Sequence, residues 1–162
     1  CLTTICTISA DGPHRSHTRK EGDRLIIRIT PDAGTVQAGD YRDVPLHRQI
    51  VTLGFEDFVR SVEQGPLFHN GKDPERYEAK AKRMSNQIAD WLRIKEIKPD
   101  GIQPNHAWRH RLKTQALELG LNIRVIDAMQ GHSGRTAGEN YGDVTIAAKV
   151  RVIDQLPEYN LA

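Results

Sequence analysis

Hydrophobic and polar positions in the amino-terminal part of the chain predict a small sheet. Residues 24–30 (RLIIRIT) are dense in β-branched side chains, which is typical of a short strand. Residues 31–40 contain two glycines and a proline and predict a hairpin-like connection, and residues 41–44 (YRDV) predict the returning strand. Residues 2–8 have the composition of a further strand, whereas the polar stretch 9–23 predicts a loop.

The next two segments have the spacing of amphipathic helices. Hydrophobic residues recur every three or four positions in both, which marks a helix face that packs against a core. The first helix is expected to begin at Pro45 and to end at Gly65, and the second to begin at the capping residue Asp73 and to end at Lys98. The expected core positions are Val51, Phe55, Phe58 and Val62 in the first helix and Tyr77, Ala81, Met84, Ile88 and Trp91 in the second.

The carboxy-terminal third predicts three more helices. The first can be capped by Asn105 and ended by Gly120 in the left-handed conformation, and the second is stopped by Gly131. The last is capped by Thr145 and ends near Pro157. The expected inward residues are Trp108, Leu112, Ala116 and Leu119 in the first, Ile123, Ile126 and Met129 in the second, and Ile146, Val150 and Ile153 in the last.

These elements indicate an α+β fold that is mainly helical, with a small antiparallel sheet at the amino-terminal end followed by a helical bundle. The 162 residues contain no repeat or internal linker, so we expect a single domain. Hydrophobic content of 38% and charged content of 27% are typical of a globular protein. No apolar run is long enough to span a bilayer, which predicts no membrane partner. The two cysteines, Cys1 and Cys6, do not build a disulfide framework, so a cytoplasmic protein is expected.

The distribution of charge is more informative than the formal net charge of +2. Residues 106–113 (HAWRHRLK) place two arginines, a lysine and two histidines on two turns of helix, which favours contact with DNA. Residues 72–83 are also basic, but their cations alternate with acids, and they are interpreted as a solvated helix face.

Four residues in the carboxy-terminal third have side chains suited to attack on a phosphate ester. His106 and Arg109 are three positions apart and therefore share a helix face. His132 directly follows the helix stop at Gly131, and Tyr141 comes nine positions later in a stretch interrupted by glycines. A tyrosine can form a reversible phosphoryl bond, although its phenol, with an ordinary pKa of about 10, needs help to lose the proton. An arginine fork neutralises charge on the non-bridging oxygens, and histidines donate or move protons, so no metal is required.

The motifs that hold these residues resemble the carboxy-terminal half of the tyrosine recombinase (phage integrase) catalytic domain. HAWR at 106–109, QGH at 130–132 and ENYGD at 139–143 follow one another in the order and spacing of that family. Residues 42–47 (RDVPLH) are similar to the strand that enters a helix in these enzymes, and residues 22–35 to the strand before it.

The resemblance extends over about residues 22–157 and implies a role for each candidate residue. It makes Tyr141 the nucleophile that becomes linked to a DNA 3′-phosphate, and Arg109 the second arginine of the phosphate clamp. His106 is implied to be the acid/base histidine of the HxxR motif. His132 is implied to be the late histidine that hydrogen-bonds the phosphate.

The implied function is site-specific recombination or integration of mobile DNA through a 3′-phosphotyrosine intermediate, with no cofactor, metal or small-molecule substrate. The implied partners are duplex DNA and other recombinase protomers. The tail, residues 150–162, can dock on such a neighbour, as tails do in this family, or pack on its own domain. Residues 1–162 are then expected to be a single, amino-terminally incomplete tyrosine recombinase catalytic domain.

The chain departs from the family pattern at two positions. The family has another clamp arginine on an early helix, and nothing in residues 1–21 reproduces that motif; Arg15 and Arg19 lie in a polar, loop-like stretch. The family also has a lysine on the hairpin between the strands, which protonates the leaving 5′-oxygen, and residues 31–40 contain none. Val36 or Gln37 lies about where it is expected.

Both departures predict a very weak recombinase or an inactive one. Loss of a charge-stabilising donor costs about 2.7–4 kcal/mol of barrier, and loss of a proton donor costs about a hundred-fold in rate or more. The chain is then either a trimmed piece of a longer enzyme or the product of a degraded gene copy. The missing lysine favours decay, because trimming removes no internal residue.

Interpretations without this chemistry stay open. Tyr141 can be a packing residue, His106 and Arg109 a solvated basic face, and His132 an ordinary cap. A metal hydrolase would use His106, His110 and His132, but position 107 is alanine, so the glutamate base of the HExxH motif is missing. A catalytically defunct DNA-binding module of the same fold and a purely structural interaction protein are the remaining alternatives.

Overall fold

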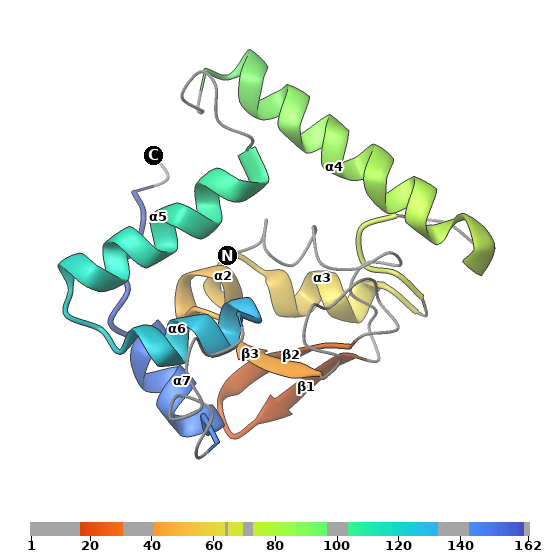
Figure 1. Cartoon of the computed structure of the whole chain (residues 1–162). Coiled ribbons are helices and arrows are strands. Elements are labelled where there is room, and N and C mark those ends of the chain that lie inside the picture. Colours follow the sequence, from red (N-terminus) through yellow and green to blue (C-terminus); the bar gives the residue numbers. More distant parts are fainter. Residues whose placement is uncertain are drawn as a thin grey trace.

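The computed structural model describes residues 17–30, 41–63, 65–69, 73–96, 104–132 and 143–160, without the side chains of Pro74 and residues 104–106. Within them the fold is α+β, with a three-stranded antiparallel sheet on the amino-terminal side and helices after it (Figure 1). The strand expected at 2–8, the connection 31–40 and the helix break at Lys98 lie outside the described residues. No helix in the described segments is long and apolar enough to cross a bilayer.

The sheet has the order β1-β2-β3, formed by β1 (Thr18–Glu21), β2 (Arg24–Ile29) and β3 (Arg42–Pro45). β2 and β3 confirm the expected strands. β1 corrects the expectation of a loop over 9–23, because its four residues pair with β2 through a tight turn that contains Gly22 at φ +61°. The polar composition of β1 misled the interpretation, since the cross-strand partners of its charged residues stabilise it in place of a buried apolar face.

The two faces of the sheet differ in chemistry because side chains alternate along each strand. One face is apolar and packs on the helices that follow the sheet. Its core consists of Leu25, Ile27, Ile29, Val44 and Leu46 with Phe55, Val59 and Leu67. The other face carries a network of charged side chains from all three strands.

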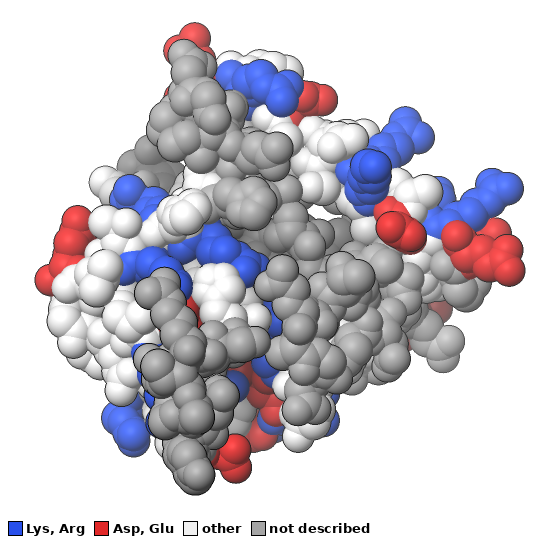
Figure 2. Space-filling model, viewed as in Figure 1, with Lys and Arg blue, Asp and Glu red and all other residues white. Residues whose placement is uncertain are grey.

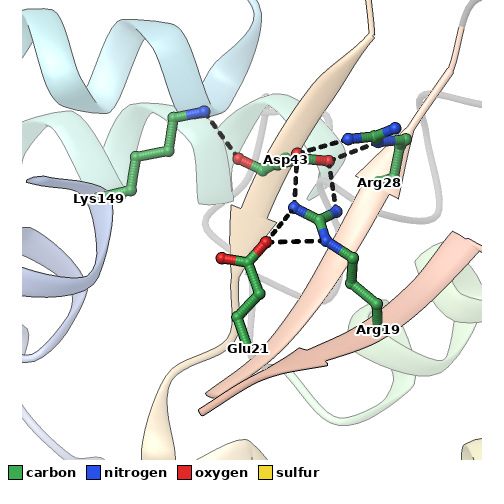
Figure 3. A network of polar contacts seen from close by, with 5 residues as sticks. All are labelled: Arg19, Glu21, Arg28, Asp43 and Lys149. Carbon is green, nitrogen blue, oxygen red and sulfur yellow. Dashed lines mark hydrogen bonds and ion pairs between the residues drawn. The ribbon is translucent and has the colours of Figure 1, made fainter. Parts of the chain in front are cut away.

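Asp43 is the centre of the charged network (Figure 3). Its carboxylate accepts two hydrogen bonds from Arg28, at 2.8 and 2.9 Å, and two from Arg19, at 2.9 and 2.8 Å. The bonds from Arg28 and then Arg19 outweigh the effect of burial and hold the pKa of Asp43 well below its usual range. Lys149 reaches the same strand from the last helix and donates to the Asp43 carbonyl oxygen at 2.8 Å.

Two short helices, α2 (Arg48–Thr52) and α3 (Phe55–Ser61), cover the apolar face (Figure 1). They correct the expectation of one helix from Pro45 to Gly65. Pro45 is the last residue of β3, and the first helix begins after His47, whose Nδ1 accepts from the Gln49 amide at 3.2 Å. Gly54, at φ +89°, separates the two helices, because a left-handed residue cannot continue an α-helix.

The long helix α4 (Tyr77–Ile94) extends along one side of the molecule, away from the sheet (Figure 1). It follows a 3-10 turn, η3 (Pro74–Arg76), where Asp73 accepts from the Glu75 amide at 3.1 Å and confirms the expected cap. Its expected core stripe is only partly buried. Trp91 is 53% exposed and Leu92 is buried instead.

A second core joins the helices α5 (Pro104–Glu118), α6 (Ile123–Gln130) and α7 (Ile146–Ile153). Its buried residues are Ala116, Leu121, Val125, Ile126, Met129, Val152 and Ile153. Gly120 and Gly131 have positive φ and Thr145 caps α7, all as expected. Two details were wrong: α5 begins before Asn105, and Leu119 lies past the end of α5 and is 47% exposed.

The carboxy-terminal tail packs on its own domain rather than extending away from it. The Leu156 carbonyl is 3.1 Å from His47 Nε2, and the Tyr159 hydroxyl donates to Gln115 at 3.0 Å. The Tyr159 amide also donates to Gln49 at 2.9 Å. The tail therefore connects α2 with α5, and the alternative of packing in the same chain is the one observed here.

Candidate functional site

Two neighbouring helices position the residues of the HAWR and QGH motifs. Arg109 lies in the first half of α5, and His132 is the residue after Gly131, the left-handed cap of α6. Gln130 is only 2% exposed, and its side-chain amide donates to the Arg109 carbonyl oxygen at 3.0 Å. This buried bond fixes the end of α6 against the middle of α5, which brings the two motifs to one place.

Arg109 and His132 are in direct contact. Nη1 of Arg109 is 2.9 Å from Nε2 of His132, and Nδ1 of His132 is 3.0 Å from Oδ1 of Asp127. A guanidinium can only donate, so in this arrangement Nε2 accepts and Nδ1 carries the proton that Asp127 accepts. The His132 amide also donates to the Asp127 carbonyl at 2.9 Å, so both its backbone and its ring are fixed by one residue.

Asp127 stays ionised in this cluster. Its Oδ1 forms an ion pair with Lys113 at 2.6 Å in addition to its bond with His132. Burial alone would raise the pKa of Asp127, but hydrogen bonds from Lys113 and His132 outweigh it and lower the pKa. The carboxylate therefore selects the His132 tautomer and can also stabilise a protonated imidazole.

Arg42 adds a second guanidinium to the cluster. It is 8% exposed and reaches from β3 to the end of α6, where a Cβ built on Gly131 would lie 2.8 Å from its Cζ. Its Nε is buried without a hydrogen-bond partner among the described residues. Burial, and then the charge of Arg109, lower the pKa of Arg42 to about 10. Burial lowers the pKa of Arg109 as well.

Arg42 was not predicted as a site residue, although its strand contained a signal. It stands two positions before Val44 and four before Leu46, both of which point into the core. Strand alternation places Arg42 on the same buried face, and a buried arginine on the apolar face of a sheet is unusual. The contact with α6 could not be predicted, because it joins residues 42 and 131 across the whole domain.

The side chains of the other two predicted catalytic residues lie outside the described structure. His106 lies in the first turn of α5, one helical turn before Arg109, but its side chain is outside the described residues. Tyr141 lies outside them altogether. Their roles stay predictions.

Of the two arginines in residues 1–21, Arg19 is held by other side chains and Arg15 lies outside the described residues. Arg19 is held by Asp43 and Glu21, and Lys20 forms an ion pair with Glu56 at 3.2 Å. The hairpin 31–40, which lacks the expected lysine, lies outside the described residues. Among the described side chains, which do not include that of His106, no group of three or more His, Cys, Asp or Glu could hold a metal ion.

Basic side chains are visible on the side of the molecule that holds α5 and α6 (Figure 2). Along α4, by contrast, basic and acidic side chains alternate, as the solvated-face interpretation of 72–83 expects (Figure 2). A separate groove of about 750 Å³ lies between α4 and Phe68–His69. Its lining shares no residue with the Arg109–His132 cluster.

The chain finds no match among protein-family models, curated proteins or solved structures. The resemblance to tyrosine recombinases therefore rests on the sequence motifs alone.

Proposed function

We propose that this chain is part of a tyrosine-recombinase-type DNA strand transferase, in which Arg109 and His132 hold the phosphate that Tyr141 attacks. The observation that supports it is the 2.9 Å contact between Arg109 and His132. These residues belong to two motifs that are 23 positions apart in the sequence, and the fold brings them into contact on adjacent helices. Its partners are duplex DNA and further protomers, inside the cell.

Arg109 neutralises the phosphate. The transition state of phosphoryl transfer spreads charge over the non-bridging oxygens, and an arginine fork provides two parallel donors for them. Arg109 is half-buried and has no carboxylate partner among the described residues. Because its Nη1 donates to a neutral imidazole, an incoming phosphate oxygen is a stronger acceptor and displaces that bond.

His132 takes up and donates a proton beside the phosphate that Arg109 binds. With Nδ1–H bound to Asp127, its Nε2 lone pair faces Arg109 and becomes free when phosphate takes the Arg109 donor. Nε2 can then take up a proton from solvent water, and the imidazolium that results is stabilised by Asp127 and donates a hydrogen bond to a non-bridging oxygen.

Tyr141 and His106 complete the proposed site. Nine residues of extended chain span about 30 Å, so the interval after His132 is long enough to bring Tyr141 to the phosphate. His106 lies one turn before Arg109 on α5 and serves as the acid/base group.

The alternative is a DNA-binding module without turnover. It is favoured by the absence of a lysine from residues 31–40, since the leaving 5′-oxygen then has no proton donor from the hairpin. Both proposals share the phosphate contact of Arg109, and they differ in whether Tyr141 forms a covalent bond.

A covalent-capture assay tests the proposal. A pool of nicked suicide duplexes with a randomised centre is incubated with the wild-type chain and with Tyr141→Phe, and SDS-stable protein–DNA adducts are detected by electrophoresis. We expect non-covalent DNA binding by both chains, a trace of adduct from the wild type, and none from Tyr141→Phe. Arg109→Ala is expected to remove the trace as well.

Each other outcome has a defined meaning. DNA binding without any adduct selects the non-catalytic alternative. An adduct that persists in Tyr141→Phe contradicts the assignment of the nucleophile. A wild-type chain with no affinity for DNA at low salt contradicts both proposals and points to a structural interaction protein.

A further inference from the structure

The guanidinium of Arg42 is a buried cation for which the described structure offers no anion. The side chain is 8% exposed, and its Nε has no hydrogen-bond partner in the described part of the chain. Two other buried charged residues of the described structure have hydrogen-bond partners: the Asp43 carboxylate accepts from two arginines, and Lys149 donates to a backbone carbonyl. Arg42 thus differs from Asp43 and Lys149, which have hydrogen-bond partners.

The charge that lowers the pKa of Arg42, in addition to burial, has the same sign. Arg109 is the charged group that acts on Arg42, and it too has burial as the cause of its lowered pKa. Two guanidiniums that burial removes from water beside the same helix end are unfavourable unless an anion lies between them. The nearby acid Asp127 does not serve, because it is engaged with Lys113 and His132.

Gly131 makes the approach of Arg42 possible. A Cβ at this position would overlap the Arg42 guanidinium, so only glycine lets Arg42 pack against the backbone directly before His132. Arg42, Arg109 and His132 are therefore gathered around the end of α6, although they come from β3, α5 and the residue after α6.

We propose that Arg42 and Arg109 together form a two-arginine site for a phosphate oxyanion, specifically a phosphodiester of duplex DNA, with His132 at its edge. This inference rests on the proposed function and deepens it. It gives Arg42, a strand residue, the charge-neutralising role of the family's other clamp arginine, whose motif residues 1–21 do not reproduce. A fork from each arginine can bind a different non-bridging oxygen, which a single arginine cannot do with the same geometry.

The rival interpretation is structural. A cation at the end of α6 is favoured by the helix dipole, so Arg42 can act as a cap for that helix. No hydrogen bond from Arg42 to a carbonyl of α6 is present among the described residues. The two interpretations predict opposite effects of removing the charge, which makes them separable.

Isothermal titration with inorganic phosphate at constant ionic strength tests the site. The wild-type chain, Arg42→Met, Arg42→Lys and the control Arg60→Gln are compared; Arg60 is an exposed arginine of α3, paired with Glu56. We expect one saturable site in the wild type and in Arg60→Gln. We expect at least a ten-fold loss of affinity in Arg42→Met, and an intermediate loss in Arg42→Lys, which keeps the charge and the fold but not the fork.

Thermal melts in phosphate-free buffer complete the test. The melting temperature of Arg42→Met should equal or exceed that of the wild type, because an unpaired buried charge is gone, and phosphate should raise it less than it raises the wild type. A lower melting temperature with phosphate affinity unchanged selects the helix cap and overturns the proposal. So does a wild-type chain without saturable phosphate binding.

A competition experiment separates a DNA diester from free phosphate. Inorganic phosphate should displace a labelled duplex from the wild type at constant ionic strength, and should do so less well from Arg42→Met. Phosphate that binds without displacing DNA indicates a site for the free ion and overturns the assignment to DNA. Unchanged phosphate affinity in Arg42→Met, alongside a Tyr141-dependent adduct, refutes this inference and leaves the proposed function intact.

Discussion

The guanidinium of Arg42 packs against the backbone of Gly131, so closely that a Cβ on Gly131 would lie 2.8 Å from Arg42 Cζ. The two residues come from β3 and from the cap of α6, and their contact ties the sheet to the helix that ends at His132. The effect of this contact on the free energy of unfolding can be measured by substitution.

Gly131→Ala should destabilise the fold more than Gly120→Ala. Both glycines have positive φ, +75° and +64°, so both substitutions cost about 1–2 kcal/mol for a left-handed alanine. Only at Gly131 does the new Cβ also meet Arg42, since nothing lies within 4 Å of it at Gly120. Urea denaturation of both variants, repeated in an Arg42→Met background, measures the difference. The difference in stability between Gly131→Ala and Gly120→Ala should disappear in that background. If the difference persists, Arg42 is not its cause.

Asp43→Asn should lower stability at neutral pH and remove part of its acid sensitivity. The folded pKa of Asp43 lies below its unfolded value near 3.8, because Arg28 and Arg19 stabilise the carboxylate. The stabilisation is therefore fully present above pH 4 and is lost as the pH falls through the lower folded pKa. We expect a loss of roughly 2 kcal/mol, limited by the partial solvation of both arginines.

The measurement is the free energy of unfolding by urea at a series of pH values between neutrality and acid. The curve of Asp43→Asn should be flatter than that of the wild type below pH 4. Asp23→Asn is a suitable control, because the Asp23 side chain is 87% exposed. Parallel curves for the wild type and Asp43→Asn would mean that the network in Figure 3 does not stabilise the fold.

Periodicity predicted the helices of the carboxy-terminal third, because each has a strong cap and a glycine or polar break. Gly120, Gly131 and Thr145 act as expected. Periodicity failed where the local pattern competes with tertiary context. Gly54 splits a helix whose hydrophobic spacing is continuous, and residues 18–21 form a strand whose stability comes from cross-strand partners rather than from composition.

Half of the expected cluster is observed, and the structure adds one residue to it. Arg109 and His132 are in contact because Arg109 lies on α5 and His132 directly follows the adjacent helix α6. The ends of both helices could be predicted from their glycines, but the contact between them could not. Arg42 reaches them through a contact between β3 and α6, and no local pattern carries information on such a contact. Tyr141 and the His106 side chain lie outside the described residues, so their parts in the cluster stay predictions.

The central claim is that Arg109 binds a DNA phosphate, and the salt dependence of duplex binding tests it most directly. Fluorescence anisotropy of a labelled duplex gives the slope of log Kobs against log salt concentration for the wild type, Arg109→Gln and Arg28→Gln. Arg28 is the control, because Asp43 already occupies its guanidinium. We predict that Arg109→Gln weakens binding and reduces the magnitude of the slope by about 0.9, whereas Arg28→Gln leaves the slope unchanged. An unchanged slope and affinity in Arg109→Gln would contradict the claim.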